Sequence, residues 1–412
     1  MAFPSGVAGE ATGLSDRYTI VNAAAETRAV HVNWADGHTS RFHYLWLRDN
    51  CPGEQSRAAG TSQRLIDSSE IPADIAPSSV EVRDDEALVV IWKDDGHRSV
   101  FEAQWLRDHC CTKLERERRR PRPFLWDASI KTAPPAADYA ELDSDAGRFS
   151  WLAMLIDYGF SILRNVPTQT GQVQQVANVI GYVRETNYGR LFDVISIPQP
   201  NNLAYTDRGL AVHTDNPYRD PVPGIQLLHC LEAHAAGGET ILVDGFRVAE
   251  ELRTECPAAF ETLSTMPRAF RFADQHTDLR CETPLIHTDA FGNVTSIRFN
   301  NRSASTLSLP EEAIEPYYEA YRHFAALMYD SRFEYRFKLQ PGDLVAMDNE
   351  RVLHGRTGFD STAGGRHLQG LYVDRDEVGS RLRVLARTLG LSGGDPGIPG
   401  GPRLPIAMRG SR

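Results

Sequence analysis

The first third of the 412-residue chain contains an internal repeat. VHVNWADGHTSRFHYLWLRDNC (residues 30–51) recurs as VVIWKDDGHRSVFEAQWLRDHC (residues 89–110). In each copy apolar and polar residues alternate, an Asp-Gly pair interrupts the alternation, and a Trp-Leu-Arg-Asp segment ends the unit. Alternation is typical of half-buried strands, and Asp-Gly is typical of a hairpin turn. The repeat therefore predicts a small β-rich domain of two hairpin units over residues 18–115.

The rest of the chain predicts a second, larger domain. A basic run, KLERERRRPRP (residues 113–123), separates the two, and its glutamates favour a solvated linker over a nucleic-acid contact. From 125 to 388, short strand-like runs alternate with helical stretches within residues 145–167, 244–266 and 310–330. We expect a mainly β fold with flanking helices, in which a double-stranded β-helix (jelly-roll) follows the small β-rich domain. The Gly/Pro-rich end, residues 389–412, predicts a disordered tail.

Composition excludes several classes of partner. The net charge of -11 disfavours nucleic acid or an anionic membrane surface as the main partner. No apolar run approaches the length of about eighteen residues that a transmembrane helix needs, and the first residues lack the pattern of a secretory signal. Six cysteines are scattered without the dense spacing of a disulfide framework. We therefore expect a cytoplasmic protein.

The tripeptide His-Thr-Asp occurs twice, at residues 213–215 and 287–289. Residues two apart on a strand point to the same face, so either pair could bind a metal ion together with a third ligand. LQPGDLVAMDNERVLHGRTGF (residues 339–359) supplies His354 after an apolar strand. Two histidines and a carboxylate hold one face of a ferrous ion and leave positions for a co-substrate and dioxygen. The sequence thus predicts an iron site at His213, Asp215 and His354.

The second copy has no separate partner histidine. His287 and Asp289 flank the turn-like DAFGN between two strand-like runs, so we expect them to be hairpin residues and not ligands. Downstream of His354, Arg366 can pair bidentately with the distal carboxylate of 2-oxoglutarate. Thr240 can donate a hydroxyl to the same carboxylate, although an ordinary strand threonine is the alternative.

Five segments give the chain a specific resemblance. They are HTDNPYRDPVPGIQLLHCLE, GGETILVDGF, FNNRS, PGDLVAMDNERVLHGR and RHLQGLYVD. In this order they resemble the taurine-dioxygenase-like superfamily of Fe(II)/2-oxoglutarate oxygenases, and within it the γ-butyrobetaine and trimethyllysine dioxygenase family. The repeated WLRDNC/WLRDHC segments are similar to the small domain that precedes the catalytic domain there. The resemblance spans roughly residues 18–388 and implies Fe(II) at His213, Asp215 and His354, with 2-oxoglutarate at Arg366 and Thr240. It also implies dioxygen as co-substrate, ascorbate as a supporting reductant, and a homodimer.

The resemblance further implies a pocket for a quaternary-ammonium substrate. Four aromatic residues align with the family's cage for a trimethylammonium group: Tyr188, Phe192, Tyr205 and Tyr372. Such a group has no N–H donor, so aromatic faces suit it through cation–π attraction, whereas each aromatic alone is more often core packing. The family commonly has Trp where Phe192 stands. Asn202 and Asn300 match the amides that hold the substrate carboxylate, with turn chemistry as the alternative.

Several substrates stay open at this point. γ-Butyrobetaine, hydroxylated to L-carnitine, is the leading hypothesis; the alternatives are trimethyllysine, a trimethylammonium phosphonate or a natural-product intermediate. An additional charged residue near the asparagines would separate these, and Arg298 and Arg302 are the candidates. A non-catalytic binding module is a further alternative. The complete set of iron and 2-oxoglutarate residues argues against it, because binding alone has no need for them.

A structural zinc ion is not expected in the small domain. The resembling enzymes hold one with three cysteines and a histidine. Here Cys51 and His97 match, but Gly53 and Ser56 stand at the other two positions. Two ligands are too few for a structural zinc site, which needs four. We expect a cluster of Trp34, Trp46, Trp92 and Trp105 to hold the domain together instead.

Overall fold

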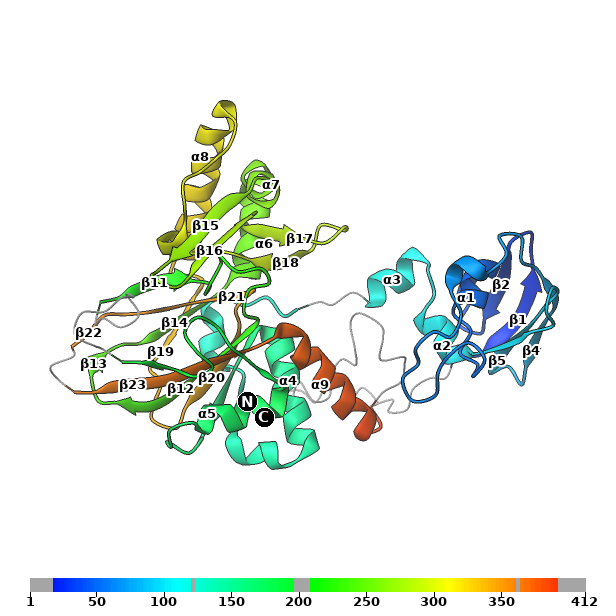
Figure 1. The fold of residues 1–412 in the computed structure, drawn as a ribbon, viewed down its shortest axis with the longest axis horizontal. Coiled ribbons are helices and arrows are strands. Elements are labelled where there is room, and N and C mark those ends of the chain that lie inside the picture. Colours follow the sequence, from blue (N-terminus) through cyan, green and yellow to red (C-terminus); the bar gives the residue numbers. More distant parts are fainter. Residues whose placement is uncertain (1–17, 120–122, 196–207, 361–363, 392–412) are drawn as a thin grey trace, which may run out of the picture. The chain divides into compact units, whose positions relative to one another are not determined.

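The computed structural model describes residues 18–119, 123–195, 208–360 and 364–391. The chain divides into two compact units, the first reaching Pro121 and the second running from Arg122 to Gly390 (Figure 1). Asn202 and Tyr205 lie outside the described residues, as does the predicted tail from residue 392 onwards. None of the described helices combines the length and apolarity needed to cross a membrane.

The first unit contains two three-stranded antiparallel sheets that follow the sequence repeat. Their strands are β1 (Ile20–Ala25), β2 (Ala29–Trp34) and β3 (Thr39–His43), then β4 (Pro77–Arg83), β5 (Ala87–Trp92) and β6 (Arg98–Glu102). The hairpins that the repeat predicts are present. Gly37 and Gly96 adopt φ of +80° and +66° in their turns, a conformation that favours glycine. The two Trp-Leu-Arg-Asp segments form the short helices α1 (Tyr44–Asp49) and α2 (Ala103–Asp108).

The predicted tryptophan cluster is confirmed. Trp34 and Trp92 are buried in one shared core, and each donates its indole N–H to a buried serine hydroxyl of its own hairpin, at 2.8 and 2.9 Å. Trp46 and Trp105 pack against this core with ring centroids 5.6 Å apart. The repeat thus supplies the same side chain twice, and the copies meet in the middle of the unit.

Each half of the repeat also contributes a cysteine that contacts a histidine of the other half. The Cys51 thiol lies 3.3 Å from Nε2 of His97, and the Cys110 thiol lies 3.4 Å from Nε2 of His38. Within the described residues, neither pair belongs to a group of three or more metal-ligating side chains. The absence of a structural zinc ion stays a prediction.

The basic run after the repeat is not a solvated linker, and that prediction is wrong for residues 113–119. These residues form α3 (Lys113–Arg119). Glu115 is buried there and accepts two hydrogen bonds from the buried guanidinium of Arg107, which also donates to Asp36. The error has a physical cause. A run of alternating charges predicts an exposed segment, and the burial of Glu115 cannot be foreseen unless its partner Arg107 is known.

The second unit is built on two larger sheets. The seven-stranded sheet has the order β10-β23-β12-β20-β8-β7, with β9 also paired to β23, and the four-stranded sheet has the order β11-β21-β14-β19. The bounds of the first are β7 (Ala136–Asp138), β8 (Phe160–Arg164), β9 (Val183–Arg184), β10 (Phe192–Val194), β12 (Ile225–Ala233), β20 (Leu344–Asp348) and β23 (Arg366–Val373). Those of the second are β11 (Leu210–His213), β14 (Thr240–Asp244), β19 (Glu334–Phe337) and β21 (Val352–Arg356). Three short antiparallel pairs accompany them: β13 (Ala236–Gly237) with β22 (Phe359–Asp360), β15 (Arg268–Ala273) with β16 (Asp278–Thr283), and β17 (Ile286–Thr288) with β18 (Val294–Ile297).

The two larger sheets pack face to face. Leu242 and Val352 of the four-stranded sheet share one buried cluster with Val345, Met347 and Leu368 of the seven-stranded sheet. Because alternate residues of a strand point to the same face, this cluster fixes which residues face inward on every strand. The same alternation directs Thr240, His354 and Arg366 into the space between the sheets.

Helices cover the outer faces, so the mainly β fold with flanking helices is confirmed (Figure 1). Helices α4 (Asp145–Tyr158) and α5 (Gln172–Ile180) pack along the seven-stranded sheet, and α9 (Arg375–Thr388) packs against these two helices. Helices α6 (Gly245–Glu255), α7 (Pro257–Thr265) and α8 (Glu311–Met328) form a second group, in which α6 contacts β14 and β21. Asp244 caps α6, its side chain accepting from the amide of Phe246.

The second His-Thr-Asp copy lies on the β17–β18 hairpin, as predicted. The Asp289 carboxylate accepts from the backbone amides of Phe291 and Asn293 and so closes the turn. His287 is partly buried, with Nε2 3.1 Å from the Thr283 hydroxyl. Asp289 thus has its partners within the hairpin turn, and His287 has its partner at the end of β16.

Candidate active site

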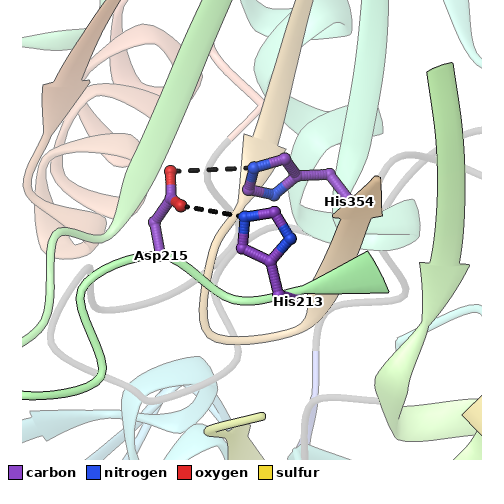
Figure 2. Close-up of side chains that lie close together, drawn as sticks. All are labelled: His213, Asp215 and His354. Atoms are coloured by element: carbon purple, nitrogen blue, oxygen red, sulfur yellow. Dashed lines mark ion pairs between the residues drawn. The ribbon is translucent and has the colours of Figure 1, made fainter. Parts of the chain in front are cut away.

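Three predicted ligands meet at the end of β11. His213 ends this strand and pairs directly with His354 on β21, and Asp215 follows two residues later. Nε2 of His213 lies 3.3 Å from one Asp215 oxygen, and Nε2 of His354 lies 3.7 Å from the other (Figure 2). Among the described residues, this is the only group of three or more His, Cys, Asp or Glu side chains close enough to share a metal ion.

The protonation of the three side chains suits a divalent cation. Nδ1 of His213 lies 2.9 Å from the carbonyl of Ala211, which can only accept, so Nδ1 bears the hydrogen and Nε2 presents a lone pair. Burial lowers the pKa of His354 to about 4, which keeps this imidazole neutral near pH 7. Burial raises the pKa of Asp215, but the neighbouring His354 and His213 lower it by a larger amount. The net pKa lies below the usual range of a carboxyl group, so the carboxylate is anionic. Lone pairs of two imidazoles and one carboxylate converge, which is the donor set of a non-haem ferrous centre.

Hydrogen bonds hold Asp215 in one orientation. Gln226 on β12 and Tyr372 on β23 each donate to the same oxygen, Oδ2, at 2.7 Å. The side chain of Asn349 accepts from the Asp215 amide at 2.6 Å and donates to its carbonyl at 3.0 Å. Two donors on Oδ2 leave Oδ1 directed at His213, so the carboxylate is presented as a ligand through one oxygen.

Gln226 and Asn349 were not predicted from the sequence. Gln226 is the one amide in the apolar run GIQLLHCLE, and a buried amide needs a partner, so its position was a usable signal. Asn349 sits in a turn, where asparagine is common for local reasons, and nothing in the sequence connects it with Asp215.

One cavity joins the metal ligands to most of the other predicted site residues. It is lined by Tyr188, Phe192, Val194, Leu210, His213, Asp215, Asn216, Gln226, Leu228, Thr240, Arg302, His354, Gly355, Arg356, Arg366, Leu368 and Tyr372. Thr240 enters from β14, and Arg366 and Tyr372 enter from the same face of β23. Burial lowers the pKa of the Arg366 guanidinium, although this group stays charged at neutral pH. A half-buried arginine in the same cavity as the metal ligands is suited to an anionic group there.

An aromatic wall lines one part of this cavity. The rings of Phe192 and Tyr372 have centroids 5.3 Å apart, and β10 pairs with β23 so that Phe192 lies opposite Gly370. A Cβ at Gly370 would come within 2.6 Å of two Phe192 ring carbons, so the glycine makes room for that ring. Tyr188 completes the described part of the wall, with its hydroxyl 3.2 Å from that of Tyr218.

The structure uses Asn300 as a cap. Its buried side chain accepts from the amides of Arg302 and Ser303 at the start of a single helical turn, residues 301–303, and donates to the carbonyl of Thr214 at 2.9 Å. This is the turn chemistry that was the alternative reading of the sequence. The sequence indicates two arginines near Asn300 as candidates for contact with the substrate. Arg298 is buried, donates to the Arg219 carbonyl and is not among the residues that line the cavity. Arg302 does line the cavity.

Comparisons with known proteins agree with this geometry. Residues 120–372 match the family described as taurine catabolism dioxygenase TauD, TfdA family, and residues 21–107 match the gamma-butyrobetaine hydroxylase-like N-terminal family. The γ-butyrobetaine dioxygenase of Pseudomonas sp. (strain AK-1) is 41% identical over 89% of this chain and 96% of its own. The mitochondrial trimethyllysine dioxygenase of Gallus gallus is 33% identical over 84% of this chain and 83% of its own. A solved taurine dioxygenase from Burkholderia xenovorans has a TM-score of 0.43 at 15% identity, covering 61% of this chain and 89% of its own. The chain therefore belongs to the TauD/TfdA dioxygenase family and is a dioxygenase, with the amino-terminal domain of the γ-butyrobetaine hydroxylase-like group.

Proposed function

We propose that the protein hydroxylates γ-butyrobetaine to L-carnitine, with Fe(II) as the metal and 2-oxoglutarate and dioxygen as co-substrates. One observation supports this most directly: the His213, Asp215 and His354 ligands share a single cavity with a half-buried arginine, Arg366, and an aromatic wall. The names of the relatives point to the same substrate class. We also infer that the two facing sheets of the second unit are the halves of a double-stranded β-helix, preceded by the small β-rich domain.

The roles of the side chains follow from their positions in the cavity. His213, Asp215 and His354 would hold the iron, which when bound supplies the activation of dioxygen for C–H hydroxylation. Arg366 binds the distal carboxylate of 2-oxoglutarate in a bidentate pair, and Thr240 donates its hydroxyl to the same group. Tyr188, Phe192 and Tyr372 receive the trimethylammonium group on their ring faces, with Tyr205 as the fourth proposed member.

Water exclusion and orientation are the protein's other contributions. Leu228 and Leu368 line the cavity between the sheets and reduce its access to water. The aromatic wall fixes one end of the substrate, so that the carbon to be hydroxylated is held at a set distance from the metal ligands.

The proposal also includes the cellular compartment, the oligomeric state and a supporting reductant. All six cysteines are free thiols, which supports a reducing compartment and hence the cytoplasm. The homodimer, the supporting role of ascorbate and the substrate-carboxylate contact of Asn202 stay predictions from the resemblance.

A substrate panel tests the proposed function. Succinate release would be measured with Fe(II), 2-oxoglutarate and one of γ-butyrobetaine, trimethyllysine or a trimethylammonium phosphonate. We expect γ-butyrobetaine to give the highest kcat/KM and a hydroxylated product, and His213→Ala to abolish release. Faster turnover of trimethyllysine or the phosphonate would redirect the assignment, and full activity of His213→Ala would refute the metal site.

A further inference from the structure

Arg302 is a cavity residue whose role the proposed function leaves unassigned. Three arginines line the cavity. Arg366 is assigned to 2-oxoglutarate, and Arg356 donates to the carbonyl of Arg208 at 2.8 Å and lies over the ring of Phe359. The guanidinium of Arg302 is exposed, and it forms no ion pair with any side chain in the described parts of the chain. It is therefore a cation at the solvent-accessible part of the cavity, available to a bound anion.

The backbone that presents Arg302 is fixed to the metal-binding segment. The amide of Thr214 donates to the carbonyl of Phe299 at 2.8 Å, and the amide of Phe299 donates to the Thr214 hydroxyl at 3.0 Å. Asn300 then bonds at once to the Thr214 carbonyl and to the Arg302 amide. Thr214 lies between two metal ligands, so these four hydrogen bonds hold the start of the Arg302 side chain in a set position relative to the metal.

The charges in the cavity suggest the polarity of its ligand. Among the lining residues that the structure describes, Asp215 is the one acidic side chain, and it is committed to the metal site. The aromatic wall offers neutral π faces to a cation without N–H donors. A guanidinium offers two parallel donors to a carboxylate. An aromatic wall and a free guanidinium in one cavity fit a short zwitterion better than a cation alone.

We propose that Arg302 binds the carboxylate of the substrate, and that Asn300 is a positioning residue that acts through Arg302 by capping its turn. This inference rests on the proposed hydroxylation of a trimethylammonium carboxylate. Asn300 fits the positioning role because its side chain caps the turn and donates to the Thr214 carbonyl, and because Asn300 is not among the described residues that line the cavity.

Kinetics of Arg302→Gln provide the first test. The substrates are γ-butyrobetaine and its analogue in which a primary amide replaces the carboxylate. We expect KM for γ-butyrobetaine to rise about tenfold, the size of one charge-assisted hydrogen bond at a partly exposed site. KM for the amide and for 2-oxoglutarate should change little, so the preference for carboxylate over amide falls by the same factor. Arg271→Gln is the control, since Arg271 is exposed, pairs with Asp278 and does not line the cavity.

A double-mutant cycle tests the role of Asn300. If Asn300 acts through Arg302, Asn300→Ala raises KM for γ-butyrobetaine in the parent protein but adds nothing in the Arg302→Gln background. Asn300→Ser, which keeps an oxygen at the cap, should recover much of the loss. An Asn300→Ala effect that is equally large in both backgrounds would show direct contact and overturn the positioning role.

The outcomes also separate this inference from the proposed function. If the parent protein releases no succinate with γ-butyrobetaine, the proposed function fails. If the parent turns over γ-butyrobetaine and Arg302→Gln keeps its KM and its carboxylate preference, the function stands and the assignment of Arg302 is wrong.

Discussion

Tyr372→Phe removes one hydrogen bond to the metal-binding carboxylate and leaves the aromatic ring in place. The Tyr372 hydroxyl is buried and donates to Oδ2 of Asp215 at 2.7 Å. Gln226 is the other side-chain donor to this oxygen. Without the hydroxyl, Oδ2 has a single amide donor, and the nearest metal-ligand nitrogen is Nε2 of His354 at 3.7 Å.

The expected loss of metal affinity follows from the freedom that the Asp215 carboxylate gains. A hydrogen bond to a charged group is worth about 1.5–3 kcal/mol. After its loss Oδ2 is held by the Gln226 amide alone, so the carboxylate can turn away from the orientation that a metal ion requires, and metal binding must then reverse this turn. Loss of a single outer partner of a metal ligand typically costs about 10- to 100-fold in metal affinity. Because Gln226 remains, we expect the lower end of this range, about tenfold.

The assay is a metal titration of the full-length protein with Mn(II) or Co(II), followed by tryptophan fluorescence or the visible Co(II) spectrum. Tyr188→Phe is the matched control. It removes a hydroxyl from the same aromatic wall, and the partner of that hydroxyl, at 3.2 Å, is the hydroxyl of Tyr218. Tyr372→Phe should weaken metal binding about tenfold while Tyr188→Phe leaves it within twofold. Unchanged metal affinity in Tyr372→Phe, with a raised KM for the substrate, would refute the argument and leave Tyr372 as a cage residue only.

Three further predictions concern other parts of the molecule. Arg366→Ala should raise KM for 2-oxoglutarate about 100-fold, because the carboxylate loses its paired charge, and steady-state succinate release measures it; a change confined to γ-butyrobetaine would contradict the assignment. Gly370→Ala should raise KM for γ-butyrobetaine with metal affinity unchanged, because the new Cβ displaces the Phe192 ring; equal KM values would show that this ring does not contact the substrate. Arg107→Leu should destabilise the first unit by about 3 kcal/mol in urea unfolding, because Glu115 keeps a buried charge without its partner, and Arg107→Leu with Glu115→Leu should recover part of this. Burial raises the pKa of Asp36, but hydrogen bonds from Arg107 lower it below its usual range. The stability that the Arg107–Asp36 pair contributes is therefore present above about pH 4 and is lost as the pH falls further. In Arg107→Leu the free energy of unfolding should consequently fall less steeply when the pH is lowered.

The sequence predicted the features that depend on periodicity. Alternation along the strands places Thr240, His354 and Arg366 on inward faces, and the hairpin pattern of the repeat places the four tryptophans in one cluster. Both depend on residues close together in the chain, where the period of the side chains determines which face they occupy.

Features that depend on one particular distant partner were missed. Glu115 is buried only because Arg107 on another helix meets it. Asn349 acts on Asp215 across 134 positions of the chain. A polar residue's local sequence is the same whether it caps a turn or binds a ligand, so the sequence leaves both roles open for Asn300, which caps the Arg302 turn in the structure. Hydrogen-bond partners become visible only when the sheets are packed.

The aromatic wall and the metal site are joined through a single side chain, and this connection limits how each can vary. Tyr372 presents its ring to the cavity and its hydroxyl to Asp215, so it cannot be exchanged for another aromatic residue without changing the metal ligand. Phe192 has no such second function: its ring packs on Tyr372 and over Gly370. A departure from tryptophan at Phe192 therefore changes only the strength and shape of the aromatic wall. If Phe192 and Arg302 have the roles proposed above, the same reasoning predicts that substrate preference in this protein is adjusted at these two positions, while Tyr372 is held constant by the metal.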